Sequence, residues 1–341
     1  MVLVLFTLGA CSQQPSEQDF TFETMGTVAS CKLMLPRGLS SDEAKAIVRG
    51  SFAEVNTALS TWSPDSEISR LSRAAADSAI NISPLLRTCL LKSQQLHEKS
   101  EGAFDPTAEG LMRLWGFYSR QGRLPSPATL DSVLADLGQW RLEGNPARVI
   151  KEKSGTSFDL GGIAKGLAVD LAAARLRKAG LQNGLIDLGG NLYCLGGAPG
   201  RADWRVGIRN PRNRDELFAT VTVSEASVAT SGSYERFVVI DGHRYGHIMN
   251  PATGRPAEGL LSATVVAPEG ILADGLSTTL FVLGPEKAVE FLRKYYAEVD
   301  AILVVPGLGG AVDTVMATHR LRGRLALVPG FEKQYRIIFS D

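Results

Sequence analysis

The sequence has few cysteines, and none of them lies in a pattern typical of a disulfide framework or a metal site. It contains four. Cys11 belongs to a separate amino-terminal segment, which leaves Cys31, Cys89 and Cys194 at wide, irregular spacing. A disulfide framework favours an even number of cysteines, and a zinc site favours closely spaced ones. We therefore expect neither, and predict three small buried side chains.

An excess of charge of one sign is also missing. Lysine plus arginine number 36, and aspartate plus glutamate also number 36. No bulk charge thus points to nucleic acid or to an acidic membrane surface. The sequence contains no GxGxxG fingerprint and no repeat of short fixed period. Its 341 residues, 44% of them hydrophobic, can bury a substantial core in one large domain or two smaller ones.

The amino-terminal segment is apolar from Met1 to Ala10, and the end of this run forms the quartet Leu8-Gly9-Ala10-Cys11. That quartet is similar to the lipobox that precedes the lipidated cysteine of bacterial lipoproteins. The apolar stretch is too short to span a bilayer. A signal peptide's basic beginning is missing, which a start site placed too far downstream would explain; a frayed apolar terminus is the alternative. We expect residues 1–19 to be a signal and tether with lipidated Cys11, and residues 20–341 to form the functional domain.

Helix and strand signals are mixed along the domain without strict alternation. Cap residues and apolar spacing predict helices over residues 40–59, 83–97, 131–137, 163–180, 272–283 and 285–296. Apolar runs and turn residues predict strands over residues 20–35, 149–158, 185–195, 204–208, 219–223, 237–240, 243–247, 261–267, 301–305, 325–328 and 336–339. This order predicts an α+β or mixed α/β architecture, with mixed sheets packed against helices.

A glycine turn before a helix is the first candidate site. Asp159 is followed by Leu160-Gly161-Gly162, and Lys165 lies in the first turn of the predicted helix. The glycines let a ligand approach the backbone, and the helix start offers unpaired N–H groups and partial positive charge, which favour a phosphate. The segment does not match a P-loop, because Ala164 rather than glycine precedes the lysine. The alternative is an ordinary strand-to-helix turn.

The second candidate is Ala273-Asp274-Gly275-Leu276-Ser277-Thr278. In a helix, Asp274, Ser277 and Thr278 lie at i, i+3 and i+4 and share one face. Such oxygen ligands suit a hard cation such as Mg²⁺. In the alternative, the hydroxyls are bonded back to the helix and hold no metal.

Two further candidates are a histidine and a set of side chains beside turns. His247 ends the predicted hairpin and precedes a loop, where an imidazole could serve as a general base; a satisfied, partly buried histidine is the alternative. His243 lies at strand spacing from it, so we expect no zinc pair. Met25, Trp62 and Phe104 could wall an apolar slot for a flat ring, although each alone is more typical of core packing.

In this order and spacing, these segments resemble the FAD:protein FMN transferase family, also called thiamine biosynthesis lipoprotein ApbE. The resemblance runs from about Phe20 to about Gly284. It is carried by MGT at Met25, LSTW at Leu59 with SEIS at Ser66, GAFDPT at Gly102, LWGF at Leu114, DLGGIAKG at Asp159, IDLGGN at Ile186, TSGSYERF at Thr230, HIMNPATG at His247 and ADGLSTTLFVLG at Ala273.

The resemblance implies a T-fold-like α+β fold, in one domain or two closely packed subdomains, and an enzyme that uses FAD with Mg²⁺ or another divalent cation. Such an enzyme transfers FMN to a threonine or serine of an acceptor protein and releases AMP. Family acceptors are subunits of membrane electron-transport complexes. Together with the lipobox, this implies a lipid-anchored protein on the periplasmic side of the inner membrane of a bacterial cell envelope, with no nucleic-acid partner.

The family's functional positions carry over residue by residue. Those that contact FAD match Met25, Trp62, Ala103, Phe104, Asp105, Asp159, Lys165 and Ile248, and the metal positions match the Gly162 carbonyl, Asp274, Ser277 and Thr278. His247 matches the base that activates the acceptor hydroxyl. Asn250 and Ser233 stand where the family often has aspartate, which changes the local charge.

Two other functions stay open at the level of sequence. One is an FAD pyrophosphatase, in which water replaces the acceptor hydroxyl. The other is a non-catalytic FAD-storage lipoprotein, against which the presence of His247 argues, because storage needs no base. The sequence does not name an acceptor.

Overall fold

The computed structural model describes residues 16–340. Its helices are α1 (Ser41–Leu59), α2 (Glu67–Arg73), α3 (Pro84–Lys99), α4 (Glu109–Leu114), α5 (Pro127–Leu134), α6 (Ala164–Lys178), α7 (Gly270–Leu283) and α8 (Pro285–Tyr295), with 3₁₀ turns at Leu308–Gly310 and His319–Leu321. Its strands are β1 (Ser16–Thr24), β2 (Thr27–Leu35), β3 (Ala79–Asn81), β4 (Trp140–Glu143), β5 (Arg148–Lys151), β6 (Asn183–Leu188), β7 (Asn191–Leu195), β8 (Trp204–Asn210), β9 (Asn213–Val223), β10 (Ala226–Gly232), β11 (Phe237–Ile240), β12 (His243–Gly246), β13 (Met249–Asn250), β14 (Arg255–Pro256), β15 (Ser262–Ala267), β16 (Asp300–Val305), β17 (Asp313–Thr318), β18 (Leu325–Leu327) and β19 (Tyr335–Ser340).

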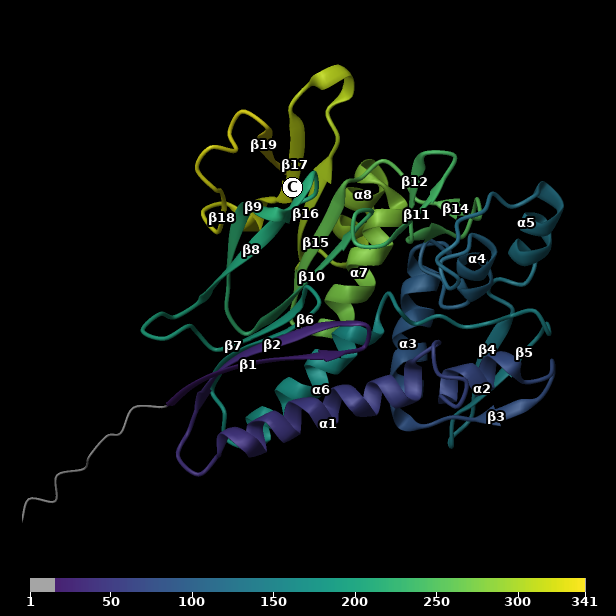
Figure 1. Ribbon diagram of the computed structural model, residues 1–341, viewed down its shortest axis with the longest axis horizontal. Coiled ribbons are helices and arrows are strands. Elements are labelled where there is room, and N and C mark those ends of the chain that lie inside the picture. The colour runs from purple at the N-terminus through teal and green to yellow at the C-terminus, as the bar shows by residue number, and fades with distance from the viewer. Residues whose placement is uncertain (1–15, 341) are drawn as a thin grey trace, which may run out of the picture.

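A nine-stranded sheet forms the centre of the fold, in the order β1-β2-β6-β7-β10-β15-β16-β17-β19. Neighbouring strands are antiparallel except β17 and β19, which are parallel. Helices α6 and α7 cross one face of this sheet, and α1 and α3 pack against them (Figure 1). The main core, which includes residues from Ala29 to Leu303, lies between these helices and the sheet. This confirms the α+β prediction.

Two smaller clusters complete the core. The sheet β18-β9-β8 covers the other face of the central sheet around Trp204, Phe218 and Tyr335. The hairpin β11–β12 packs Val238 and Ile240 against α4 and the loop that follows it. The second cluster matters for function, because the strand β12 ends one residue before His247.

Several local predictions are confirmed. Ser40 and Glu43 form the predicted capping box of α1, and Ser83 caps α3 with Pro84 in its first turn. Cys31, Cys89 and Cys194 are free and buried. Burial raises the pKa of the Cys31 thiol to about 12, so this side chain is an inert core residue.

Other predictions need correction. Helix α5 is capped by Ser126 and spans Pro127–Leu134 rather than residues 131–137. The segment 185–195 is two strands, because Gly189 and Gly190 adopt positive φ and reverse the chain between them. Strand β5 ends at Lys151, so an irregular segment rather than a strand leads into the glycine turn. The sequence analysis also missed β10 and β17.

The structure describes only part of the segment predicted to be a signal and tether. Strand β1 begins at Ser16, inside the segment predicted to be a tether. Cys11 and the apolar residues before it lie outside the described residues. Over residues 16–340, no helix combines the length and the apolar character needed to cross a bilayer.

Candidate functional site

The predicted site is held together by a close crossing of helices α6 and α7. A Cβ atom on Gly166 would lie 2.1 Å from the carbonyl oxygen of Gly270, and one on Gly270 would lie 2.5 Å from the carbonyl oxygen of Gly166. Only glycine fits at both positions at this separation. The crossing brings the backbone N–H of Gly166 to 2.9 Å from Oδ2 of Asp274. Two segments more than a hundred residues apart thus meet at one carboxylate.

Asp274 is buried, with 4% of its surface exposed. Burial raises the pKa of its carboxyl, while the charge of Lys165 and the N–H of Gly166 act in the opposite direction. The ammonium of Lys165 stays 3.9 Å from Oδ1, a long distance for an ion pair, and donates instead to the carbonyl of Gly161 at 3.2 Å. The buried carboxylate is therefore only partly compensated by positive charge.

The hydroxyls beside Asp274 differ in their partners. Ser277 donates to the backbone carbonyl of Asp274 at 2.8 Å, the back-bonded geometry that was the alternative prediction. Thr278 instead reaches across to the glycine turn before α6, where its Oγ1 lies 3.3 Å from the carbonyl oxygen of Gly162. Ser231, on β10, contacts the Oγ atoms of Ser277 and Thr278 at 2.9 and 3.3 Å.

These oxygen atoms suit a magnesium ion. Adjacent ligands of an octahedral Mg²⁺ lie about 3 Å apart, because each is about 2.1 Å from the ion. The separation of 3.3 Å between Thr278 Oγ1 and the Gly162 carbonyl is close to that value. No group of three or more His, Cys, Asp or Glu side chains converges anywhere in residues 16–340. A site with one carboxylate is typical of Mg²⁺ that keeps waters and binds substrate phosphates.

Asp159 organises the other end of the turn. Its Oδ1 accepts a hydrogen bond from the N–H of Gly161 at 2.7 Å, and its Oδ2 accepts one from the hydroxyl of Tyr118 at 2.9 Å. The ring of Tyr118 lies against that of Trp62, with centroids 5.0 Å apart. Trp62 is 58% exposed, so a large aromatic face is open to solvent beside the turn. An exposed indole is a suitable surface for a flat ring.

The loop 102–107 approaches the turn with its backbone and one ring. Phe104 is buried, and its ring lies 3.5 Å from the position that a Cβ on Gly162 would take. Asp105, predicted to contact FAD, is turned inward: its Oδ1 accepts from the N–H of Thr107 at 2.8 Å, and its Oδ2 lies 3.6 Å from Nδ1 of His97. Ala103 is half-buried beside Phe104.

His247 lies directly after the hairpin β11–β12. Burial and the charges of Arg236 and Lys165 lower the pKa of its imidazole to about 4. Its Nδ1 is buried and has no hydrogen-bond partner among the described residues. A neutral, unpartnered imidazole of this kind can accept a proton. Ile248, the next residue, is 7% exposed, and its carbonyl accepts from Ala257 at 2.8 Å.

The β1–β2 turn reaches the site from a third direction. Met25 has a φ of 49°, and Gly26 follows with a φ of 70°. The guanidinium of Arg236 lies over this turn, 3.5 Å from the position of a Cβ on Gly26. Met25 therefore approaches the site near Arg236 and His247.

Two positions that depart from the family pattern have local structural roles. Oδ1 of Asn250 accepts a hydrogen bond from the N–H of Ala252 at 3.0 Å, a turn contact that aspartate would also make. Ser233 packs closely on Gly246, whose Cβ would lie 3.2 Å from the serine Cα.

Sequence reasoning missed three residues of this neighbourhood. Ser231 contacts both predicted hydroxyl ligands, Tyr118 holds Asp159, and Arg236 accompanies His247. Ser231 and Arg236 lie within the TSGSYERF motif, and Tyr118 directly follows LWGF. Their place in these motifs was the available signal, but only tertiary contacts assign each a partner.

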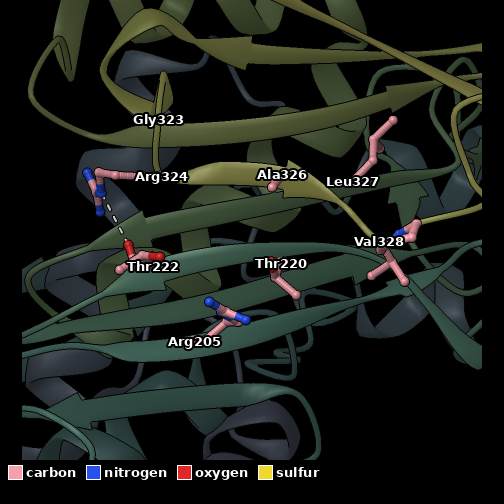
Figure 2. A pocket seen from close by; sticks show the side chains of 9 residues that line it. Arg205, Thr220, Thr222, Gly323, Arg324, Ala326, Leu327 and Val328 are labelled. Carbon is pink, nitrogen blue, oxygen red and sulfur yellow. Dashed lines mark hydrogen bonds between the residues drawn. The ribbon is translucent and has the colours of Figure 1, made fainter. Parts of the chain in front are cut away.

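A separate hollow of about 380 Å³ lies on the outer face of β8, β9 and β18. Figure 2 shows Arg324 beside Thr222, whose carbonyl accepts from its Nε at 3.1 Å. The other end of Arg324 pairs with Asp300 at 2.8 Å. None of the predicted site residues lines this hollow.

The fold and sequence match known proteins over nearly the whole chain. The sequence profile of the ApbE family matches residues 25–303. An FAD:protein FMN transferase of Treponema pallidum is 32% identical, over 92% of this chain and 94% of that protein; one of Escherichia coli K12 is 31% identical, over 93% and 94%.

Solved structures give the same result. The flavin transferase ApbE from Vibrio cholerae superimposes with a TM-score of 0.81 at 28% identity, over 91% of this chain and 99% of that one. The apo form of Pseudomonas stutzeri flavinyl transferase ApbE also gives 0.81, at 31% identity over 92% and 98%. The chain belongs to the ApbE family.

Proposed function

We propose that this protein is an FAD:protein FMN transferase, which moves the FMN moiety of FAD onto a serine or threonine of an acceptor protein and releases AMP. The observation that carries the proposal is the contact between the glycine turn and α7. There Thr278 contacts the Gly162 carbonyl, and the Asp274 carboxylate contacts the N–H of Gly166. Lys165 lies 3.9 Å from Asp274, and its charge acts on His247. Relatives covering most of the chain carry the same name.

Mg²⁺ is the proposed metal. Its protein ligands would be Asp274, Thr278 and the Gly162 carbonyl, with Ser277 and Ser231 supporting Thr278 through their hydroxyls. The partly compensated charge of Asp274 supports this assignment, because a buried carboxylate is stabilised by a cation. When bound, the ion would neutralise charge on the non-bridging oxygens of a diphosphate.

The reaction needs charge neutralisation and an oriented nucleophile, with little covalent help from the protein. Lys165 supplies a fixed positive charge at the start of α6. His247 takes the proton of the acceptor hydroxyl as its oxygen attacks the phosphorus of the FMN half. The bond from that phosphorus to the bridging oxygen breaks, and AMP leaves with the bonding electrons. Burial of the site favours transfer over hydrolysis, because it excludes water that would compete with the acceptor hydroxyl.

The flavin-binding residues are proposed in two groups. Trp62 offers an exposed ring that Tyr118 links to Asp159, and Phe104 packs beside Gly162. Asp105 acts through the loop, because its carboxylate stabilises the segment that carries Ala103 and Phe104. Met25, on the turn that Arg236 approaches, and Ile248, which follows His247, complete the set.

The acceptor and the location are proposals from the sequence alone. We infer that a lipid on Cys11 anchors the protein to the periplasmic side of the inner membrane. There it would meet acceptor subunits of membrane electron-transport complexes. Incorporation of labelled palmitate into the full-length chain, but not into Cys11→Ser, tests the anchor; an unlabelled wild-type chain would reject it.

A release assay separates transfer from hydrolysis. The protein is incubated with FAD and Mg²⁺, with and without an acceptor, and AMP and free FMN are measured. A transferase releases AMP only when acceptor is present and leaves little free FMN. Equal AMP and FMN without acceptor would indicate a pyrophosphatase, and uncleaved FAD under both conditions would indicate storage.

A further inference from the structure

Arg236 and His247 are held side by side at the open end of one hairpin. Strands β11 and β12 pair Phe237 with Gly246, and the next residue on each side continues this contact. The carbonyl of Arg236 accepts a hydrogen bond from the backbone N–H of His247 at 3.1 Å. Neither residue can move away without opening the end of the hairpin, so their separation is fixed by backbone structure.

The guanidinium of Arg236 reaches from this position over the β1–β2 turn. Its Nη2 atom lies 3.5 Å from the position of a Cβ on Gly26. It therefore lies next to the turn that carries Met25, and its charge also acts on His247.

This guanidinium makes no ion pair and no side-chain hydrogen bond with the part of the chain that the structure describes. Other arginines of the protein are paired: Arg212 grips Asp313 with two bonds, at 2.6 and 2.7 Å, and Arg324 binds Asp300. A solvated surface arginine needs no partner, but Arg236 is not remote from other charge. It and Lys165 both act electrostatically on His247.

Two cations that face one imidazole repel each other and disfavour its protonation, unless an anion lies between them. The diphosphate of FAD is such an anion. A guanidinium also presents several N–H donors in a plane that matches phosphate oxygens.

We propose that Arg236 is a catalytic residue that binds the phosphoryl group being transferred. The inference rests on the proposed function. Arg236 donates to non-bridging oxygens of the FMN phosphate as the acceptor oxygen bonds to phosphorus. The hydroxyl proton passes to His247, the bond to the bridging oxygen breaks, and AMP leaves with the electron pair. The bound phosphate also offsets the two positive charges, so His247 becomes a better base once substrate is present.

The test compares Arg236→Gln, Arg236→Lys and a control on the same hairpin, Arg244→Gln. Arg244 is exposed, and its guanidinium lies over the ring of Phe237 at 4.6 Å. Loss of one donor to a developing charge lowers kcat about 10²–10³-fold. We expect that loss in R236Q with FAD affinity changed less than tenfold, partial recovery in R236K, and wild-type kcat in R244Q.

The pH dependence of kcat/KM is the second readout. Its acid limb should move to higher pH in R236Q, because removing a nearby cation raises the pKa of His247. A purely structural role would not move it. If R236Q has the kcat of the wild type and the acid limb of its kcat/KM profile does not move, the inference is overturned.

A second measurement needs no turnover. The ring signals of His247 are titrated by NMR with and without inorganic pyrophosphate. Pyrophosphate should raise the pKa of His247 in the wild type, and raise it less in R236Q. If the wild type transfers no FMN, the proposed function is rejected. This titration would still show whether Arg236 binds an anion beside His247. A pKa that pyrophosphate leaves unchanged would overturn the role of Arg236.

Discussion

His247 is the side chain on which the proposed chemistry depends most. Its lowered pKa of about 4 keeps the imidazole uncharged at neutral pH, and its Nδ1 has no partner within residues 16–340. An imidazole that already had a hydrogen-bond acceptor in place would be fixed in one tautomer. Here the buried nitrogen has no such partner, which favours the base over the structural histidine.

Replacing His247 by alanine should abolish most transfer and spare binding. General-base assistance contributes roughly 10²–10⁴-fold, so we expect a loss of that size in the rate of FMN incorporation, with FAD affinity within a few-fold of wild type. His243→Ala is the matched control, because His243 is exposed on the same hairpin. Transfer by H247A at the wild-type rate would exclude the base role.

Asp274→Asn should separate metal binding from folding. Burial raises the pKa of Asp274, so its charged form is costly in the folded protein without metal. We expect the metal-free variant to be at least as stable as wild type and to lose the increase in thermal midpoint that Mg²⁺ with FAD gives the wild type. A calorimetric scan with and without Mg²⁺ measures both. An unchanged response to Mg²⁺ would remove Asp274 from the metal site.

The crossing of α6 and α7 positions the metal ligands at the level of whole elements. Gly166 and Gly270 let the helices approach until a backbone N–H of one meets a carboxylate of the other. Nothing in the local sequence identifies this contact. Gly166 could be assigned to a helix from its pattern, but its packing partner is more than a hundred residues away.

Gly166→Ala tests this crossing. The added methyl would lie 2.1 Å from the carbonyl oxygen of Gly270, so the helices must separate. Overpacking of this kind costs about 1–3 kcal/mol, and activity should fall with it. Gly50→Ala in α1 is the control, because its Cβ would meet no atom within 4 Å; it should stabilise the protein by about 0.5–1 kcal/mol. Chemical denaturation of both variants measures the difference, and equal effects would refute the crossing's role.

Helix α7 has no side-chain cap of its own, and Asp170 of α6 supplies one. Its oxygens accept from the N–H groups of Gly270 and Ile271 at 2.6 and 2.8 Å. Burial nevertheless raises the pKa of Asp170 from 3.8 to about 6. The folded state thus holds the proton more tightly, and the linked stabilisation is complete below pH 3.8 and lost as the pH rises through about 6.

Asp170→Asn should remove this pH dependence. We expect the free energy of unfolding of the wild type to fall by an amount on the order of 2–3 kcal/mol more than that of the variant between pH 4 and pH 7. Asp215→Asn, at an exposed aspartate, should keep the wild-type slope. Urea titrations at several pH values measure the slopes. Parallel curves for D170N and wild type would contradict the linkage.

Local signals predicted elements well where the signal was complete. The capping box at Ser40 and the Ser83-Pro84 pair gave the starts of α1 and α3, and Asp241-Gly242 gave the hairpin. Helix α5 has the same Ser-Pro signal at Ser126, five residues before Asp131, which the sequence analysis passed over. Strand β10 was missed because its small and hydroxyl residues, as at Ser231, lack a strong apolar pattern.

At the scale of the whole molecule, the site joins segments from the β1–β2 turn to α7. The sequence resemblance supplied the set of residues, and the structure shows which of them meet. Asp274, Thr278, Gly162 and Lys165 converge, whereas Asp105 turns inward to its own loop. Side-chain direction of this kind depends on contacts distant in sequence, so no motif could have given it.

The most direct measurement is the mass of a candidate acceptor protein after incubation with this protein, FAD and Mg²⁺. The structure and the family membership predict an added FMN phosphoester on one serine or threonine, with one AMP released per modified acceptor and none with H247A. An acceptor of unchanged mass, while FAD is hydrolysed to free FMN, would contradict the proposed transfer.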